Sequence, residues 1–145
     1  VFTGQFLAAH SSPGERLERD PDPAALASWI RQVEVFGERF RSLVAHWTEE
    51  LAERARIGPI SLWGAGAKAA AFLNLTGASR HVEVAVDLNP RKHGRYLPGT
   101  GHAVVAPAEL RKIRPTTVLV MNALYEREIR SSLGELGLDC ETLCV

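Results

Sequence analysis

A glycine-rich turn between an apolar run and an alanine-rich segment constrains this chain more than any other feature. The apolar run is Ile60 to Trp63, and the turn reads Gly-Ala-Gly-Ala-Lys-Ala from Gly64. This Gly-x-Gly-x-x-Ala spacing predicts a parallel strand that turns tightly into a helix, as in dinucleotide-binding folds. Gly64 would make the turn, Gly66 would let backbone amides approach a phosphate, and the small Ala69 would let the helix pack closely on the strand.

Polar residues follow the expected strands at the edge where such folds bind ligands. Asp87 closes the run Val82–Val86, about 20 residues after the turn, where a carboxylate can accept hydrogen bonds from ribose hydroxyls. Asn122 follows another apolar run, and its amide either faces the ligand edge or caps the next helix. The candidate binding residues are Gly64, Ala65, Gly66, Lys68, Asp87, Asn89, Asn122 and Tyr125.

Basic side chains cluster directly after Asp87. They either supply counter-charges for a diphosphate ligand or belong to a solvated loop. Lys68, in the first turn of the expected helix, either reaches a phosphate as a point charge or is solvated. The basic loop consists of Arg91, Lys92, His93 and Arg95.

Apolar runs alternate with helical segments over residues 59–145, which predicts an α/β fold. We expect a Rossmann-like parallel sheet with helices on both faces, because two of the runs are apolar without alternation. The expected strands are Ile60–Trp63, Val82–Val86, His102–Val105, Thr116–Met121 and Cys140–Val145, and the expected helices are Ala65–Leu75, Pro107–Ile113 and Tyr125–Leu136.

One long helix is expected before this domain. Asp22 can cap it, Pro23 suits its first position, and Gly58-Pro59 ends it. Its apolar residues recur in steps of three and four, so one face is buried. Either the helix connects this domain to an absent one, or it packs along its own sheet and self-association covers the rest. The stripe comprises Leu26, Trp29, Ile30, Val33, Phe36, Phe40, Leu43, Val44, Trp47 and Leu51.

The only methionine is Met121, so residue 1 is not an initiator and we expect a fragment or a processed product. Residues 1–14 are expected to be a remnant strand, Val1–Leu7, with a linker, Ser11–Gly14, from an upstream domain. Residues 15–58 would then form the connecting helix, and residues 59–145 the Rossmann-like C-terminal domain.

Composition excludes several classes of function. Seventeen basic residues balance 17 acidic ones, so no net charge attracts nucleic acid or an anionic membrane. No apolar run has the roughly 20 residues that cross a bilayer, and two cysteines make no metal site. Scattered histidines and the lack of a nucleophile motif predict no catalytic residue here. We therefore expect a soluble, cytoplasmic protein that binds a small molecule or a protein partner.

Several blocks beyond the glycine turn are more specific than the turn alone. Together they resemble the C-terminal domain of S-adenosylmethionine-dependent C-methyltransferases, the group that includes deoxysugar C-methyltransferases. The similarity extends over most of the chain from about Gly58. The blocks are Trp63–Lys68, Phe72–Asn74, Val86–Pro90, Gly94–Gly101, Pro107–Leu110 and Val120–Tyr125.

The resemblance implies that this domain helps to hold a nucleotide-linked sugar or a related small molecule. It also implies that the remnant at residues 1–14 comes from an upstream methyltransferase domain of the same chain. S-adenosylmethionine and the catalytic base would lie in that domain, outside this fragment, which alone would be inactive. Two other hypotheses remain open at this stage. The glycine turn and Asp87 by themselves are typical of an NAD(P)-binding oxidoreductase domain. The third hypothesis is a non-catalytic scaffold that mediates assembly, such as that of a homo-oligomer.

Overall fold

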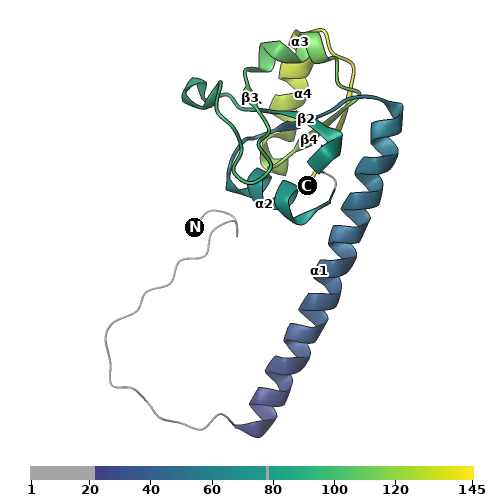
Figure 1. The fold of residues 1–145 in the computed structure, drawn as a ribbon, viewed down its shortest axis with the longest axis vertical. Helices are drawn as coiled ribbons and strands as arrows, with labels where there is room; N and C mark the ends of the chain where they lie inside the picture. Colours follow the sequence, from purple (N-terminus) through teal and green to yellow (C-terminus); the bar gives the residue numbers. More distant parts are fainter. Residues whose placement is uncertain (1–21, 78) are drawn as a thin grey trace. The chain divides into compact units, whose positions relative to one another are not determined.

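The computed structural model describes residues 22–77 and 79–145 (Figure 1). They fall into two compact units, one that ends at Phe36 and one that runs from Gly37 to Val145. The expected strand at Val1–Leu7 and the expected linker at Ser11–Gly14 lie outside the described residues. The predicted division into a remnant, a connecting helix and a domain from residue 59 stays a prediction.

The long helix α1 (Pro23–Ile57) begins and ends where the sequence predicted. The Asp22 carboxylate accepts a hydrogen bond of 3.1 Å from the amide of Ala24, which otherwise has no partner at a helix start. Helix α1 has 35 residues and ends immediately before Gly58-Pro59. Proline lacks the amide proton that would continue the helical hydrogen bonds.

The second unit is built on a sheet whose five strands are parallel, in the order β3-β2-β1-β4-β5. The chain moves outward from β1 to β3 and then returns to the other side of β1. The strand order therefore reverses between β1 and β4, as in doubly wound nucleotide-binding folds. The strands are β1 (Ile60–Trp63), β2 (Val82–Val86), β3 (Val104–Val105), β4 (Thr117–Val120) and β5 (Glu141–Cys144).

Helices cover both faces of this sheet, which confirms the predicted α/β, Rossmann-like fold. One buried cluster joins the sheet to the C-terminal part of α1 and to α2 (Ala67–Leu75). A second cluster joins the opposite face to α3 (Leu110–Ile113) and α4 (Glu126–Glu135). Every residue of β1 and β4 is buried, because both strands lie in the middle of the sheet between the two layers.

Several boundaries differ from the expected ones, and β4 and β5 are each one residue shorter at both ends than the predicted strands. Helix α2 begins at Ala67 rather than Ala65, because the glycine turn occupies the two positions before it. Strand β3 has only Val104 and Val105, since Ala103 instead pairs antiparallel with Tyr96 in a hairpin. The last helix begins with a short 3-10 segment, Ala123–Tyr125, before α4.

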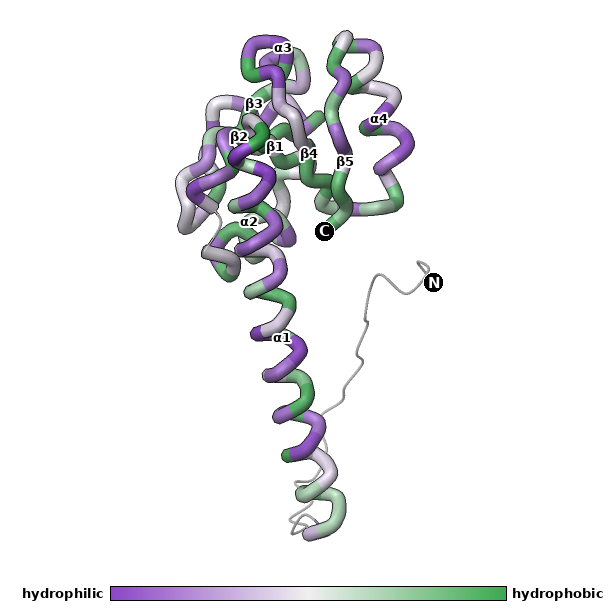
Figure 2. The backbone as a smooth tube through the Cα atoms, turned by 90° about the vertical axis from the view of Figure 1, so that its right-hand side faces the viewer, coloured by the Kyte–Doolittle hydropathy of each residue, from purple (hydrophilic) through white to green (hydrophobic). Residues whose placement is uncertain are grey.

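Only the C-terminal part of α1 contributes to the core of the second unit. Trp47 and Leu51 are its buried residues, and the Trp47 ring meets the edge of Phe72 on α2 at 5.2 Å. Arg54 is bonded to Glu50 and to Glu141 of β5, which adds a polar tie to the sheet edge. Hydrophobic and hydrophilic stretches alternate along the whole helix (Figure 2). Its exposed apolar side chains are Leu26, Trp29, Ile30, Val33, Val35, Phe36, Phe40 and Leu43.

Candidate functional site

The two glycines of the turn after β1 have different surroundings. Gly64 has a φ of 109°, which side chains disfavour, and an added Cβ would lie 3.2 Å from the Cβ of Met121. Its amide donates to the oxygen of Val86 at 2.8 Å, so the turn is tied to β2. A Cβ at Gly66 would meet nothing within 4 Å. Gly64 therefore shapes the turn, whereas Gly66 faces open space.

The start of α2 lies against this open space. Gly66 is the capping residue, and no side chain caps it. The amides of the first helical residues have no acceptor inside the helix, so this end carries a partial positive charge. Lys68, expected to reach a ligand phosphate, donates instead to the backbone oxygen of Val145 at 2.5 Å. Lys68 does not line the cavity described next.

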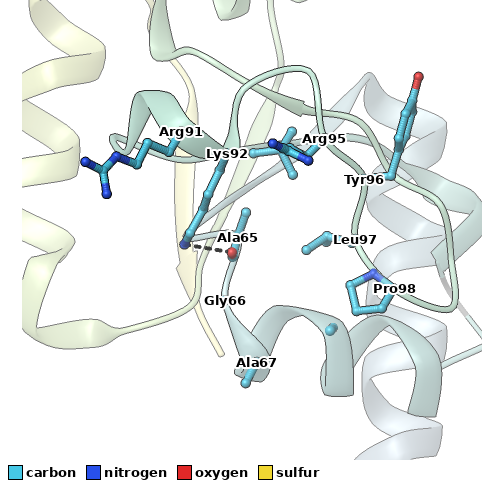
Figure 3. A pocket seen from close by; sticks show the side chains of 11 residues that line it. Ala65, Gly66, Ala67, Arg91, Lys92, Arg95, Tyr96, Leu97 and Pro98 are labelled. Atoms are coloured by element: carbon cyan, nitrogen blue, oxygen red, sulfur yellow. Dashed lines mark hydrogen bonds between the residues drawn. The ribbon is translucent and has the colours of Figure 1, made fainter.

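A cavity of about 390 Å³ separates the glycine turn from the loop after β2 (Figure 3). Figure 3 shows Lys92 along one side, Leu97 and Pro98 along the other, and Ala67 below. Two of the candidate binding residues, Ala65 and Gly66, line it; the other six do not. The lining comprises Ala65, Gly66, Ala67, Ala70, Arg91, Lys92, Arg95, Tyr96, Leu97, Pro98 and Val104.

Asp87 follows β2 as expected, but both of its carboxylate oxygens have partners inside the protein. Oδ1 accepts from the Asn89 amide at 2.9 Å, and Oδ2 pairs with Lys92 Nζ at 2.6 Å. Lys92 Nζ also donates to the Ala65 oxygen at 2.9 Å, the dashed line in Figure 3. The ammonium group thus bridges the end of β2 and the glycine turn. The side chain of Asp87 is 13% exposed.

The other polar candidates act locally. Asn89 accepts from the Arg91 amide at 3.0 Å and starts a 3-10 turn, Pro90–Lys92. Asn122 accepts from the Leu124 amide at 3.1 Å, which is the capping role that the sequence left open. Tyr125 is exposed at the same edge of the sheet. Ligand binding by these residues stays a prediction.

The basic loop divides into two kinds of side chain. Lys92 is paired with Asp87, and His93 Nε2 lies 2.7 Å from the Asp87 backbone oxygen, so both fold the loop. The guanidinium groups of Arg91 and Arg95 have no hydrogen-bond or ion-pair partner among residues 22–77 and 79–145. Both line the cavity. The cavity therefore has two unpaired cations beside an uncapped helix start.

Sequence reasoning noticed these arginines but did not place them among the binding residues. Tyr96, Leu97 and Pro98 were missed as well, although they fall in the Gly94–Gly101 block. The available signal was the glycine and proline content of that block, which predicts a turn at this edge of the sheet but not which side chains line a cavity. Asn74 on α2 donates to the Pro98 oxygen at 3.0 Å, which holds this hairpin over the helix.

Nothing in the described residues provides a metal centre or an activated thiol. No group of three or more His, Cys, Asp or Glu side chains is placed to hold a metal ion in residues 22–77 and 79–145. Cys140 and Cys144 are free, and burial raises the pKa of each thiol above its ordinary value. Raised pKa values favour the unreactive protonated form.

In the same described segments, no helix is both long and apolar enough to span a membrane.

Structural comparison finds distant likenesses. A crystal structure of RSP, a Rex-family repressor, has a TM-score of 0.47 and 14% identity over 61% of this chain and 52% of that one. A crystal structure of RSP in complex with β-NADH has a TM-score of 0.46 and 14% identity over 61% of this chain and 53% of that one. The structure of cell-free ID.343 from Thermus thermophilus has a TM-score of 0.35 and 17% identity over 66% of this chain and 90% of that one. This chain thus spans about half of the RSP chains that it matches. No curated protein matches it significantly.

A family model described as "C-methyltransferase C-terminal domain" matches residues 15–138. The match includes the glycine turn, the basic loop and every strand except β5, so it contains all of the residues that line the cavity. The chain therefore belongs to the C-methyltransferase C-terminal domain family.

Proposed function

We propose that this chain is the acceptor-binding domain of an S-adenosylmethionine-dependent C-methyltransferase. The cavity beside the glycine turn would hold the phosphate part of a nucleotide-linked sugar or a related small molecule. The observation that carries this proposal is the meeting of an uncapped helix start with two unpaired guanidinium groups around one cavity of about 390 Å³. The methyl transfer itself belongs to another domain of the enzyme.

The chemistry of the cavity suits a phosphate ester with an organic substituent. A guanidinium group presents a fork of donors that fits two phosphate oxygens, and helix amides add directed hydrogen bonds. Leu97, Pro98 and the exposed ring of Tyr96 supply an apolar edge on which a base or sugar can pack. Most small-molecule sites combine an apolar lining with a few convergent polar groups in this way.

The same residues do not fit S-adenosylmethionine. Its sulfonium is a cation, and Arg91, Lys92 and Arg95 give the cavity a positive lining. Its ribose needs a free carboxylate, whereas Asp87 is already paired with Lys92. We therefore infer that the methyl donor binds outside this chain, and that the isolated chain has no transferase activity.

We also infer a cytoplasmic location. Cys140 and Cys144 form no disulfide, which agrees with a reducing compartment.

We also infer that the N-terminal part of α1 packs against the methyltransferase domain of the same enzyme. Leu26, Trp29, Ile30 and Val33 form an apolar face there, and their side chains are 47–70% exposed. An exposed stripe of this kind indicates a protein interface. A C-terminal domain of a methyltransferase has such a neighbour available, which favours this reading over a second copy of the chain.

Thermal unfolding with added ligands tests the binding proposal. Thymidine and uridine diphosphates, and their sugar conjugates, should stabilise the chain, by about 2.7 kcal/mol at 100 times the dissociation constant. S-adenosylmethionine should not. If none of the diphosphates raises the temperature of the unfolding transition, the proposed acceptor site is wrong and the hypothesis of a non-catalytic scaffold is favoured.

Co-expression with the methyltransferase domain tests the interface. The two proteins should co-purify, and Trp29→Ala should weaken the complex about tenfold or more, since large aromatic residues dominate interfaces. Arg31→Ala, a neighbouring polar position on α1, is the matched control. Sedimentation of the chain alone should show a monomer; a dimer that Trp29→Ala abolishes would mean that a second copy covers the face instead.

A further inference from the structure

Lys92 occupies an unusual place in this fold. Its ammonium group lies 2.6 Å from Asp87 Oδ2 and 2.9 Å from the Ala65 oxygen, between the end of β2 and the turn after β1. Figure 3 shows the side chain reaching down from its loop to Ala65. The loop geometry fixes this position, because Asn89 caps the 3-10 turn that ends at Lys92.

That gap is where the ligand's ribose enters a dinucleotide-binding fold. In such a fold the carboxylate that ends the second strand accepts hydrogen bonds from ribose hydroxyls, beside the first glycine turn. Here Asp87 has the required position, but Oδ1 is bonded to the Asn89 amide and Oδ2 to Lys92. The ammonium group makes the same kind of charge-assisted hydrogen bond that a hydroxyl would make, so it competes directly with a ribose.

We propose that Lys92 determines specificity: its ammonium group fills the space between Asp87 and Ala65 that ribose hydroxyls occupy in a dinucleotide site, and so excludes NAD from this cleft. The cleft is then left with Arg91 and Arg95 as its unpaired charged groups, which direct it toward phosphates. This inference rests on the proposed function, because it assumes that the cleft binds a ligand. It explains how a glycine turn and a correctly placed aspartate can occur without dinucleotide binding.

Calorimetric titration of NAD into the whole chain and its variants tests the proposal. Wild-type protein should show no NAD binding. Lys92→Ala should show measurable NAD binding, at least about tenfold tighter than the detection limit that bounds the wild-type affinity, because it frees a carboxylate oxygen for the ribose. Adding Asp87→Asn to Lys92→Ala should remove that gain. Lys112→Ala on α3, which breaks an exposed ion pair with Glu109, is the matched control and should behave as wild type.

Lys92→Met serves as the second variant if Lys92→Ala does not fold. Methionine ends one atom short of the ammonium position, so it vacates the space between Asp87 and Ala65 while keeping most of the apolar side chain, and NAD binding should again rise above that of wild type. Three results would overturn the proposal: NAD binding by wild-type protein, no gain in a folded Lys92 variant, or a gain that survives Asp87→Asn.

Thymidine diphosphate, titrated into the same proteins, keeps this test separate from that of the proposed function. If wild-type protein binds the diphosphate but Lys92 variants gain no NAD affinity, the specificity role is wrong and the acceptor site stands. If the variants gain NAD affinity while no protein binds the diphosphate, the acceptor proposal is wrong and the role of Lys92 stands.

Discussion

At the glycine turn, a side chain added at position 64 would meet Met121, whereas one added at position 66 would meet open space. Gly64 also has a positive φ, and forcing another residue into that region costs on the order of 1–3 kcal/mol. Gly64→Ala should therefore lower the free energy of unfolding by that amount. Urea denaturation followed by circular dichroism measures it; an unchanged midpoint would show that the turn relaxes.

Gly66→Val should impair ligand binding and leave the stability of the fold almost unchanged. The free energy of unfolding should change by less than about 0.5 kcal/mol, since a Cβ added at this position has no neighbour within 4 Å. Diphosphate binding, measured by calorimetry, should be lost because the side chain blocks the approach to the α2 amides. Gly134→Val, at an exposed position of α4, is a control that should keep binding. Normal binding by Gly66→Val would exclude the turn as the site.

At the residue scale, the sequence predicted where a side chain lies in the fold more accurately than which groups it bonds to. It placed Asp87 at the end of β2 from spacing alone. It did not predict the pairing with Lys92, because that contact depends on how the 3-10 turn Pro90–Lys92 folds the loop back. Asn122 is a second example. An asparagine directly after a strand is equally compatible with helix capping and with ligand binding, and only the hydrogen bond from the Leu124 amide identifies it as a cap.

Among the elements, α1 carries two tryptophans with contrasting surroundings. Trp47 is 9% exposed and packs on Phe72, whereas Trp29 is 70% exposed. Trp47→Ala should lower the free energy of unfolding by about 3–5 kcal/mol, because it leaves a cavity in the core. Trp29→Ala should change it by less than about 0.5 kcal/mol in the isolated chain. Equal losses in urea denaturation would mean that the N-terminal part of α1 is also packed.

The tie between α1 and β5 predicts a dependence on pH. The hydrogen bond from Arg54 lowers the pKa of Glu141 below its ordinary value of 4.5. A lowered pKa stabilises the fold above the unfolded pKa, and this contribution is lost as pH falls through the folded pKa. Because the Glu141 side chain is 58% exposed, the gain is only about 0.2–1 kcal/mol.

Glu141→Gln should therefore be less stable than wild type at about pH 7, and this deficit should shrink as pH falls below 4.5 and through the folded pKa of Glu141. Urea denaturation over a series of pH values measures the difference. Glu109→Gln, which removes a more exposed ion pair with Lys112, is the comparison and should cost less. A difference that persists at the lowest pH of the series would show that Glu141 acts through packing rather than charge.

At the element scale the strands were easy to predict and the burial of α1 was not. Ile60–Trp63 and Val82–Val86 match β1 and β2 at both ends, because short apolar runs between turn residues have few alternatives. The stripe on α1 showed that one face suits burial, but a periodic pattern cannot tell which residues meet the chain's own core. Here only Trp47 and Leu51 are buried.

For the molecule as a whole, the sequence predicted the fold class and the family but not the walls of the site. The alternation of strands and helices determines the layers of the sheet, because parallel strands need crossovers. The cavity instead depends on a hairpin around Tyr96 and Ala103 that meets the glycine turn from a different part of the chain. Such a meeting of two loops leaves no periodic pattern in the sequence.

The central claim is that a phosphate-bearing ligand binds between the glycine turn and the basic loop. Amide signals of the ¹⁵N-labelled chain during titration with thymidine diphosphate test it most directly. The account predicts shifts that grow with ligand concentration at Gly66, Ala67 and Arg95, and none at Leu143 in β5. No shift, or shifts confined to β5 or to α1, would contradict it.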